Sequence, residues 1–229
     1  MRYLLTPALL LLAFAFANAQ TNLRIYEIQG SGPDSPYEDS TVTTDGIVIG
    51  LFPGLNGYCI QDRAGDNDPA TSDGIFVYEP GFSGISIGDS VEVTGDIDEF
   101  FGLTEFTNTT TTNRGSAGPV SPTDFTLPVG TYPDDFERFE GMLIRLPGMH
   151  YVTDNYNLGR FGEVWLTNNR PLIIPTDSLD PNDSPPSGAS WRDSTNVQEV
   201  RDAIDFVDNQ LIVLDDAVSG SNPSPIPFI

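Results

Sequence analysis

The sequence predicts a mainly all-β chain, and three observations lead to that fold class. Its apolar segments are short, rich in β-branched and aromatic residues, and separated by Gly, Pro, Asn and Asp. Five such segments follow one another in the first half without a helical pattern between them. Only one later segment has helical periodicity. Short strands at regular spacing are typical of a small β-barrel or sandwich.

The chain begins with the pattern of a secretory signal peptide. Arg2 supplies the positive start, residues 4–16 form the apolar run, and Ala17-Asn18-Ala19 is a small-x-small cleavage site. We therefore expect residues 1–19 to be removed and the mature protein to be secreted. No later segment approaches the roughly 18 apolar residues that a membrane span needs, so we expect no membrane span.

Residues 20–110 are expected to form the first domain. Its five predicted strands are Thr41–Leu51, Tyr58–Gln61, Gly74–Tyr78, Ser90–Ile97 and Leu103–Thr107. Ser90–Ile97 alternates, which places Val91, Val93 and Ile97 on one face. Gly95-Asp96 is a natural bulge position within that strand. The segment 111–135, rich in Thr, Ser, Gly and Pro, is predicted to be a linker.

Residues 136–229 are expected to form a second β-rich module with one short helix. The predicted strands are Gly141–Leu146, Met149–Thr153, Gly162–Thr167, Pro171–Pro175 and Gln210–Leu214, and 176–193 is an acidic, Pro-rich loop. Thr195 and Gln198 resemble a capping box at the start of the helix. The apolar stripe on this helix is that of a packing helix, and it consists of Val197, Val200, Ile204 and Val207.

The charge is strongly acidic but uneven. The formal net charge is −23, and all ten basic residues are Arg. Such a surface does not attract polyanions by bulk charge, and nucleic-acid binding normally leaves a basic footprint. Residues 20–137 carry 20 acidic residues and three Arg, a net charge of −17, whereas 138–170 sets four Arg against three acids. The one segment that is not acidic is therefore the better candidate for contact with nucleic acid.

Four carboxylates in the loop between the second and third strands are candidate metal ligands: Asp62, Asp66, Asp68 and Asp73. A regular Ca²⁺ loop needs an oxygen ligand in the third place and Gly in the sixth. Counted from Asp62, these places hold Ala64 and Asn67, so the regular pattern fails. Two interpretations stay open, a solvated hairpin loop and an irregular Ca²⁺ site. Ca²⁺ is the one cofactor that the residues suggest for this chain.

Residues for hydrolytic chemistry are scarce. His150 is the single histidine and Cys59 the single cysteine, so no His or Cys cluster exists to hold Zn²⁺ and no intrachain disulfide can form. The chain also has no Gly-x-Ser-x-Gly elbow and no lysine for a phosphate loop. We therefore predict no catalytic residues in this chain.

The segment 151–165 is the candidate contact for nucleic acid. Arg and exposed aromatic side chains are the groups that contact phosphates and stack on bases. The candidate residues in and near it are Arg145, Tyr156, Arg160 and Phe161. The alternative is a turn whose aromatic side chains enter the core.

Several stretches resemble a known family. IYEIQGSGPDSPYEDSTVTTDGIVIG, GYCIQDRAGDNDPATSDGIFVYEP and ISIGDSVEVTGDIDEFFGLTEF resemble the amino-terminal OB-like region of large secreted bacterial nucleases of the ExeM/NucH type. RFEGMLIRLPGMHYVTDNYNLGRFGEVWL and LIVLDDAVSGSNPSPIPF continue the likeness. It covers nearly the whole mature chain, in order. The resemblance implies an OB-fold-like five-stranded barrel in the first domain.

The resemblance also implies a function. In that family such modules precede a catalytic domain of the endonuclease/exonuclease/phosphatase superfamily, which uses Mg²⁺ or another divalent cation to hydrolyse DNA or RNA. None of its catalytic residues has a counterpart here, which leaves two interpretations, a fragment truncated within the second module and a stand-alone accessory protein. The abrupt apolar ending PIPFI favours truncation. The expected role of the chain is substrate positioning or domain assembly, with extracellular DNA or RNA and the downstream domain as partners. The alternative class is a Ca²⁺-dependent extracellular surface or adhesion module.

Overall fold

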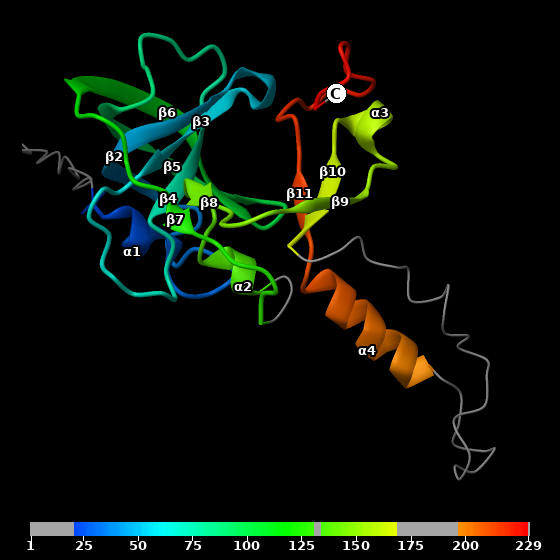
Figure 1. Cartoon of the computed structure of the whole chain (residues 1–229). Helices are drawn as coiled ribbons and strands as arrows, with labels where there is room; N and C mark the ends of the chain where they lie inside the picture. Colours follow the sequence, from blue (N-terminus) through cyan, green and yellow to red (C-terminus); the bar gives the residue numbers. More distant parts are fainter. Residues whose placement is uncertain (1–20, 131–133, 169–196, 229) are drawn as a thin grey trace, which may run out of the picture.

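The computed structural model describes residues 21–130, 134–168 and 197–228 (Figure 1). The predicted signal peptide, the predicted strand Pro171–Pro175 and the loop 176–193 lie outside these ranges. The first half contains β1 (Thr21–Asn22), α1 (Ile25–Gln29), β2 (Thr41–Phe52), the 3-10 turn η1 (Pro53–Leu55), β3 (Gly57–Gln61), β4 (Gly74–Tyr78), β5 (Asp89–Phe100) and β6 (Leu103–Ser116). The second half contains β7 (Thr123–Asp124), α2 (Asp134–Glu137), β8 (Ile144–Arg145), β9 (Tyr151–Asp154), α3 (Leu158–Phe161), β10 (Val164–Thr167), α4 (Val197–Asp208) and β11 (Ile212–Leu214).

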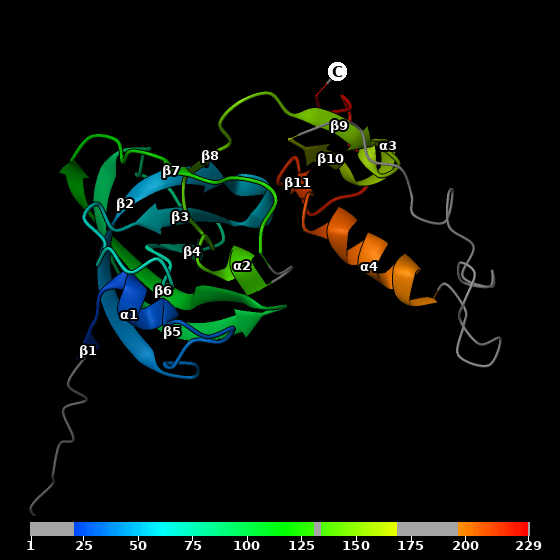
Figure 2. The same ribbon diagram turned by 60° about the horizontal axis from the view of Figure 1, so that its bottom comes forward.

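Strands β2 to β6 pair into a closed ring (Figures 1 and 2). β2 pairs with β3, and β3 with β4, in antiparallel fashion. β4 then pairs with β6 in parallel, β6 pairs with β5, and β5 returns to β2. Each of the five predicted strands lies within one of these strands. The prediction of a mainly β chain with a five-stranded, barrel-like ring is confirmed.

Alternating side chains fill the inside of the ring. Val91, Val93 and Ile97 of β5 are at most 1% exposed, as their spacing predicts. The pairing of β5 with β6 shifts register between Thr94 and Asp96, so Gly95 lies at a bulge. The other members of this core come from β2, β3, β4, β6, α1 and the residue before Arg24: Leu23, Ile25, Ile28, Val42, Val48, Tyr58, Ile60, Ile75, Val77 and Phe106.

Helix α1 is an element that the sequence does not predict. It is five residues long and contacts β2 and β4. Ile25 and Ile28, one turn apart, are both completely buried in the ring core. At its start the backbone amide of Arg24 donates to Oε2 of Glu27 at 2.8 Å. Five residues are too few to show helical periodicity in a sequence, so burial in the ring core, not propensity, holds this helix.

The structure contains strands within the predicted linker 111–135. β6 runs on to Ser116, and β7 pairs in parallel with β8. Phe125, Leu127 and Val129 are buried and form the centre of a second core. The partly buried side chains around them come from α2 and its surroundings, from β8 and from β11: Phe136, Phe139, Ile144, Leu146 and Ile212. Residues 111–116 and 123–129 are therefore part of the folded structure.

The remaining strands form a three-stranded antiparallel sheet in the order β11-β10-β9. They lie within or overlap the predicted strands Met149–Thr153, Gly162–Thr167 and Gln210–Leu214, whereas only Ile144–Arg145 of the predicted strand 141–146 is strand. α4 matches the predicted helix from Val197 on, and the predicted cap, Thr195, lies outside the described residues. Of its apolar stripe, Val200 is buried, but Ile204 is 40% exposed, so the stripe is only partly covered.

Candidate functional site

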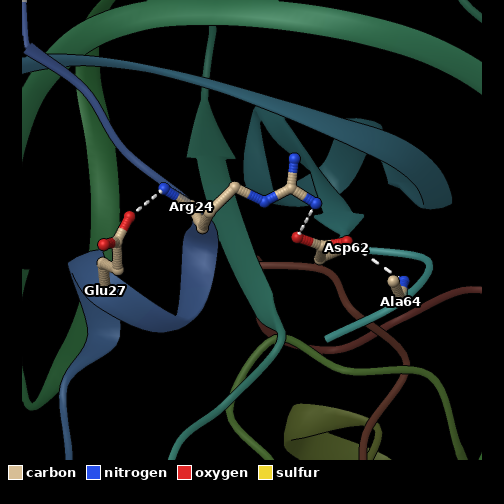
Figure 3. A network of polar contacts seen from close by, with 4 residues as sticks. All are labelled: Arg24, Glu27, Asp62 and Ala64. Carbon is tan, nitrogen blue, oxygen red and sulfur yellow. Dashed lines mark hydrogen bonds and ion pairs between the residues drawn. The ribbon is translucent and has the colours of Figure 1, made fainter. Parts of the chain in front are cut away.

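The acidic loop between β3 and β4 is closed at its base and anchored to α1. The Asp62 amide donates to the Asp73 carbonyl at 2.8 Å. The Asp62 side chain is buried and forms an ion pair with the Arg24 guanidinium (Figure 3). Its Oδ1 accepts the Ala64 amide at 3.1 Å. Asp62 is thus held by a cation of the protein and by a backbone donor.

Asp66 and Asp68 shape the turn itself. Oδ1 of Asp66 accepts the Asp68 amide at 2.8 Å, and Oδ1 of Asp68 accepts the Ala70 amide at 2.9 Å. The Thr71 hydroxyl lies 3.2 Å from both carboxylate oxygens of Asp66. Carboxylates that bind a backbone amide two residues ahead are typical of tight turns. Both side chains therefore have a structural task in this loop.

Asp73 is the least satisfied carboxyl of the loop. Burial raises its pKa above the ordinary value, and the charges of Asp66 and Asp62 raise it further. Its Oδ1 is buried without a hydrogen-bond donor. Gly65, at φ +59°, passes so close that a Cβ there would lie 2.3 Å from Oδ2 of Asp73. Only glycine fits this approach of the loop backbone to the carboxyl.

The four predicted metal ligands therefore share one loop but are not gathered around one point. Within residues 21–130, 134–168 and 197–228, no group of three His, Cys, Asp or Glu side chains has an arrangement that could hold a metal ion. Three of the four carboxylates accept hydrogen bonds from backbone amides. The Ca²⁺ site stays a prediction that requires these side chains to turn.

A second arginine, Arg63, also anchors this loop. The Arg63 guanidinium donates to the carbonyls of Ala117, Gly118 and Pro119 at 2.8, 2.7 and 3.0 Å. These carbonyls follow the end of β6, more than 50 residues away in the chain. Nothing in the local sequence around Arg63 indicates this contact. Two of the three Arg residues in the acidic first part thus hold its most acidic loop in place.

Three of the four predicted nucleic-acid contacts lie together around α3. Tyr156, in the turn before α3, is 89% exposed, and Arg160 and Phe161 are in the helix. The Arg160 guanidinium lies over the Phe161 ring, 4.8 Å from its centroid. Arg145 lies elsewhere, on β8, where its Nε donates to Asp124 at 2.6 Å. The structure thus supplies one small Arg–aromatic surface without Arg145.

Buried carboxyls near the ring were not expected from the sequence. Burial, then the neighbouring Asp98 charge, raises the pKa of Glu105 on β6 to about 7. Burial, then the charge of Glu137, raises the pKa of Glu140 to about 8. Glu105 occupies an ordinary alternating position between Thr104 and Phe106, and Glu140 follows a charged run. Neither position carries a sequence signal that separates it from a surface acid.

A cavity of about 730 Å³ lies beside the tip of the β5–β6 hairpin. Phe101 at this tip is 96% exposed and meets Phe100 edge to face, with ring centroids 4.8 Å apart. The charged residues in the lining are Asp34, Asp135, Glu137 and Arg138. A predominantly acidic lining disfavours phosphate groups, so this cavity adds no candidate phosphate contact.

Comparisons with known proteins add no family assignment: no protein-family model matches the chain, and no curated protein matches it either. None of the helices in the described part of the chain is long and apolar enough to cross a membrane.

Proposed function

We propose that this chain is a non-catalytic region of a secreted nuclease, in which a β-ring holds the following module in a fixed position. The observation that supports it is the contact of residues 140–143 with the ring. The Leu143 amide donates to Oε1 of Gln61 at 2.9 Å, and the Ser72 hydroxyl donates to the Glu140 carbonyl at 2.6 Å. Gly141 packs closely against β4: a Cβ added at this position would lie 2.7 Å from the Ile75 nitrogen.

Such a junction suits a positioning role. A backbone hydrogen-bonded to buried ring residues cannot swing freely, in contrast to a flexible linker. Whatever follows β8 is therefore presented at a defined place on the ring. Together with the sequence resemblance, this supports a role in domain assembly or substrate positioning.

The chemistry of the chain supports a non-catalytic role. Phosphodiester hydrolysis by this class of enzyme depends on carboxylates and histidines that gather divalent cations around the scissile phosphate. The chain has one histidine, and its described residues gather no such group. The net charge of −23 does not attract a polyanionic substrate, so domain assembly is the better supported of the two positioning roles.

Nuclease assays test the proposal directly. Protein comprising residues 20–229, incubated with single- and double-stranded DNA and with RNA in Mg²⁺, Mn²⁺ or Ca²⁺, is expected to leave all substrates intact. Cleavage that co-purifies with the protein would overturn the non-catalytic role. The DNA downstream of the Ile229 codon tests the nuclease assignment separately: we expect an open frame for a phosphodiesterase domain, and an immediate stop codon would contradict it.

A Ca²⁺-dependent surface module is the second candidate, and one observation favours it. Oδ1 of Asp73 is buried without a donor, and Asp66 and Asp62 face this carboxyl with like charge. A bound cation would relieve that repulsion. Calorimetric titration with Ca²⁺ distinguishes the two candidates: this candidate predicts heat of binding that an Asp66→Asn/Asp68→Asn variant loses. No binding by the unaltered protein would rule it out.

A further inference from the structure

Glu140 connects three parts of the molecule through one side chain. Its Oε1 accepts the Thr104 amide of β6 at 2.9 Å and the Gln29 side-chain amide of α1 at 3.2 Å. Its backbone carbonyl accepts the Ser72 hydroxyl from the β3–β4 loop. Gln29 also donates to the Gly74 carbonyl at 2.7 Å, so the same amide group links Glu140 to the start of β4.

The residues after Glu140 depend on this contact. A Cβ on Gly74 would lie 2.4 Å from the carbonyl carbon and oxygen of Gly141, so the two backbones touch. The Leu143 amide donates to Gln61 of β3 at 2.9 Å. Gln61 is 3% exposed, so this donor enters the protein interior. Glu140 therefore stands at the head of a short segment, 140–143, whose Glu140 carbonyl and Leu143 amide have their partners, Ser72 and Gln61, only while the segment lies against the ring.

Burial and two neighbouring carboxylates, Glu137 and Glu99, oppose ionisation of Glu140, and they outweigh the hydrogen bonds from Gln29 and Thr104, which favour it. Glu99 of β5 contacts Thr104, the residue whose amide binds Glu140. Its Oε1 accepts the Thr104 hydroxyl at 2.7 Å. Oε2 of Glu99 is buried without a hydrogen-bond donor. Glu137 of α2 adds a second like charge, and the thiol of Cys59 on β3 faces the carboxyl as a neutral group whose pKa burial raises to about 12. Arg138, the nearest basic residue in the chain, places its guanidinium over the Phe139 ring, 4.6 Å from the centroid.

We propose that Glu140 is a proton-controlled latch: protonated, it holds residues 140–143 against the ring, and ionised, it loosens them. The proton removes the repulsion from Glu99 and Glu137 while the carboxyl oxygen still accepts from Thr104 and Gln29. The inference concerns the junction itself and does not depend on the nuclease assignment.

The direction of the pH dependence follows from the pKa. Burial lifts the pKa of Glu140 from an ordinary value of 4.5 to about 8 in the docked state, whereas the released, solvated carboxyl returns toward the ordinary value. The stabilisation is therefore complete below the ordinary pKa and is lost as the pH rises toward 8. Across that window the ratio of released to docked segment increases by up to about tenfold per pH unit, and it levels off above the docked pKa.

Hydrogen exchange at the Thr104 and Leu143 amides tests the latch, with Glu140→Gln as the reference. Glutamine keeps an oxygen for Thr104 and Gln29 but does not ionise. The ratio of the wild-type to the variant exchange rate, taken at each pH, cancels the intrinsic effect of pH on exchange. We expect this ratio to rise by as much as about tenfold per unit from about pH 5.5 to 8 and then to flatten. A flat ratio over this range would overturn the proposal.

Two control variants show whether the pH dependence of exchange comes from Glu140 or from another carboxyl. The same ratio measured with Glu38→Gln, a surface carboxyl outside the junction, is expected to stay level. Glu105 is the other carboxyl with a raised pKa close to Thr104, so Glu105→Gln is measured as well. The latch would be contradicted if the ratio of wild-type to Glu105→Gln exchange rates depended on pH while the ratio of wild-type to Glu140→Gln rates did not. Glu105 would then be the carboxyl that controls the junction. Exchange at Ile60 and Val93, buried in the ring core, reports whether a variant still folds.

Discussion

At the scale of single residues, buried polar groups tie distant parts of the chain together. Tyr58 is fully buried, and its hydroxyl lies 2.6 Å from the Thr111 hydroxyl and 3.1 Å from Oε2 of Glu79. Thr111 in turn donates to Glu79 at 2.6 Å, which completes a three-membered network. Buried polar groups stabilise a fold only while each keeps its partner. The same principle applies to the ion pair at the base of the acidic loop.

Arg24→Ala is expected to destabilise the protein, because it leaves the buried Asp62 carboxylate without its cation. Arg24 is about half exposed, so we expect a loss of about 1–3 kcal/mol in the free energy of unfolding, measured by urea denaturation. The double variant Arg24→Ala/Asp62→Asn removes the charge as well and should recover part of the loss. Equal stability of wild type and Arg24→Ala would show that this ion pair contributes nothing.

Glu105→Gln is expected to change how stability depends on pH. Burial and the Asp98 charge raise the pKa of Glu105 to about 7, so this carboxyl stabilises the fold fully below its ordinary pKa and loses that effect as the pH passes 7. The variant should therefore exceed wild type at about pH 8 by about 1 kcal/mol, discounted for solvent screening, and lose this advantage near pH 5. Thermal unfolding at the two pH values gives the comparison, and an advantage that is the same at both would contradict it.

At the scale of elements, strands with clean alternation could be predicted from the sequence, and short or sparsely patterned elements could not. Ser90–Ile97 was recognised because Val91 and Val93 alternate with polar residues. The segment 123–129 falls in the predicted linker, although Phe125, Leu127 and Val129 also alternate. The Thr, Pro and Gly between them obscured that pattern. The ion pair of Arg24 with Asp62 joins residues far apart in sequence, so no local pattern could predict it.

Gly74→Ala is expected to disturb the junction between the ring and residues 140–143. The new Cβ would lie 2.4 Å from backbone atoms of Gly141, which cannot rotate away as a side chain can. We expect a loss of about 1–3 kcal/mol in the free energy of unfolding. Gly159→Ala is the matched control, since no atom lies within 4 Å of its Cβ position. Similar denaturation midpoints for the two variants would argue against a tight contact at Gly74.

Arg160→Ala is expected to weaken any nucleic-acid binding by the surface around α3. Removing one phosphate contact should lower the affinity for single-stranded DNA and reduce the slope of log K against log salt by about 0.7. Fluorescence anisotropy at several salt concentrations measures both quantities. Arg145→Ala is the control, because Arg145 is already paired with Asp124 on the neighbouring strand. If both variants bind like wild type, α3 is not the contact surface.

At the scale of the whole molecule, charge is the dominant property. The chain has ten Arg and 33 acidic residues. Three of these Arg, Arg24, Arg114 and Arg145, form ion pairs with acidic residues within the fold. Like charges spread over one surface destabilise the compact state through mutual repulsion. The overall fold depends on the apolar core and tolerates this charge. Composition therefore predicts the charge of the surface, whereas the fold class is predicted from the pattern of apolar residues.

Added salt is therefore expected to stabilise the protein. Screening shortens the reach of surface charges from about 10 Å at 0.1 M salt to about 3 Å at 1 M. The thermal midpoint should rise as NaCl is increased across this range, and it should rise similarly with KCl, because screening does not depend on which of these cations is present. A midpoint that falls with added salt would mean that the few ion pairs outweigh the general repulsion.

The way the ring closes has a consequence for the nascent chain. β2 pairs with β5, which joins Thr41 to Asp96, 55 residues later, and β4 finds its parallel partner only in β6. A growing polypeptide can form the β2–β3–β4 meander early, but both outer strands of that meander keep unpaired edges until β5 and β6 have been synthesised. Unpaired edges invite association with other chains. The interval between the emergence of β4 and that of β6 is therefore the period in which this protein most needs protection from aggregation.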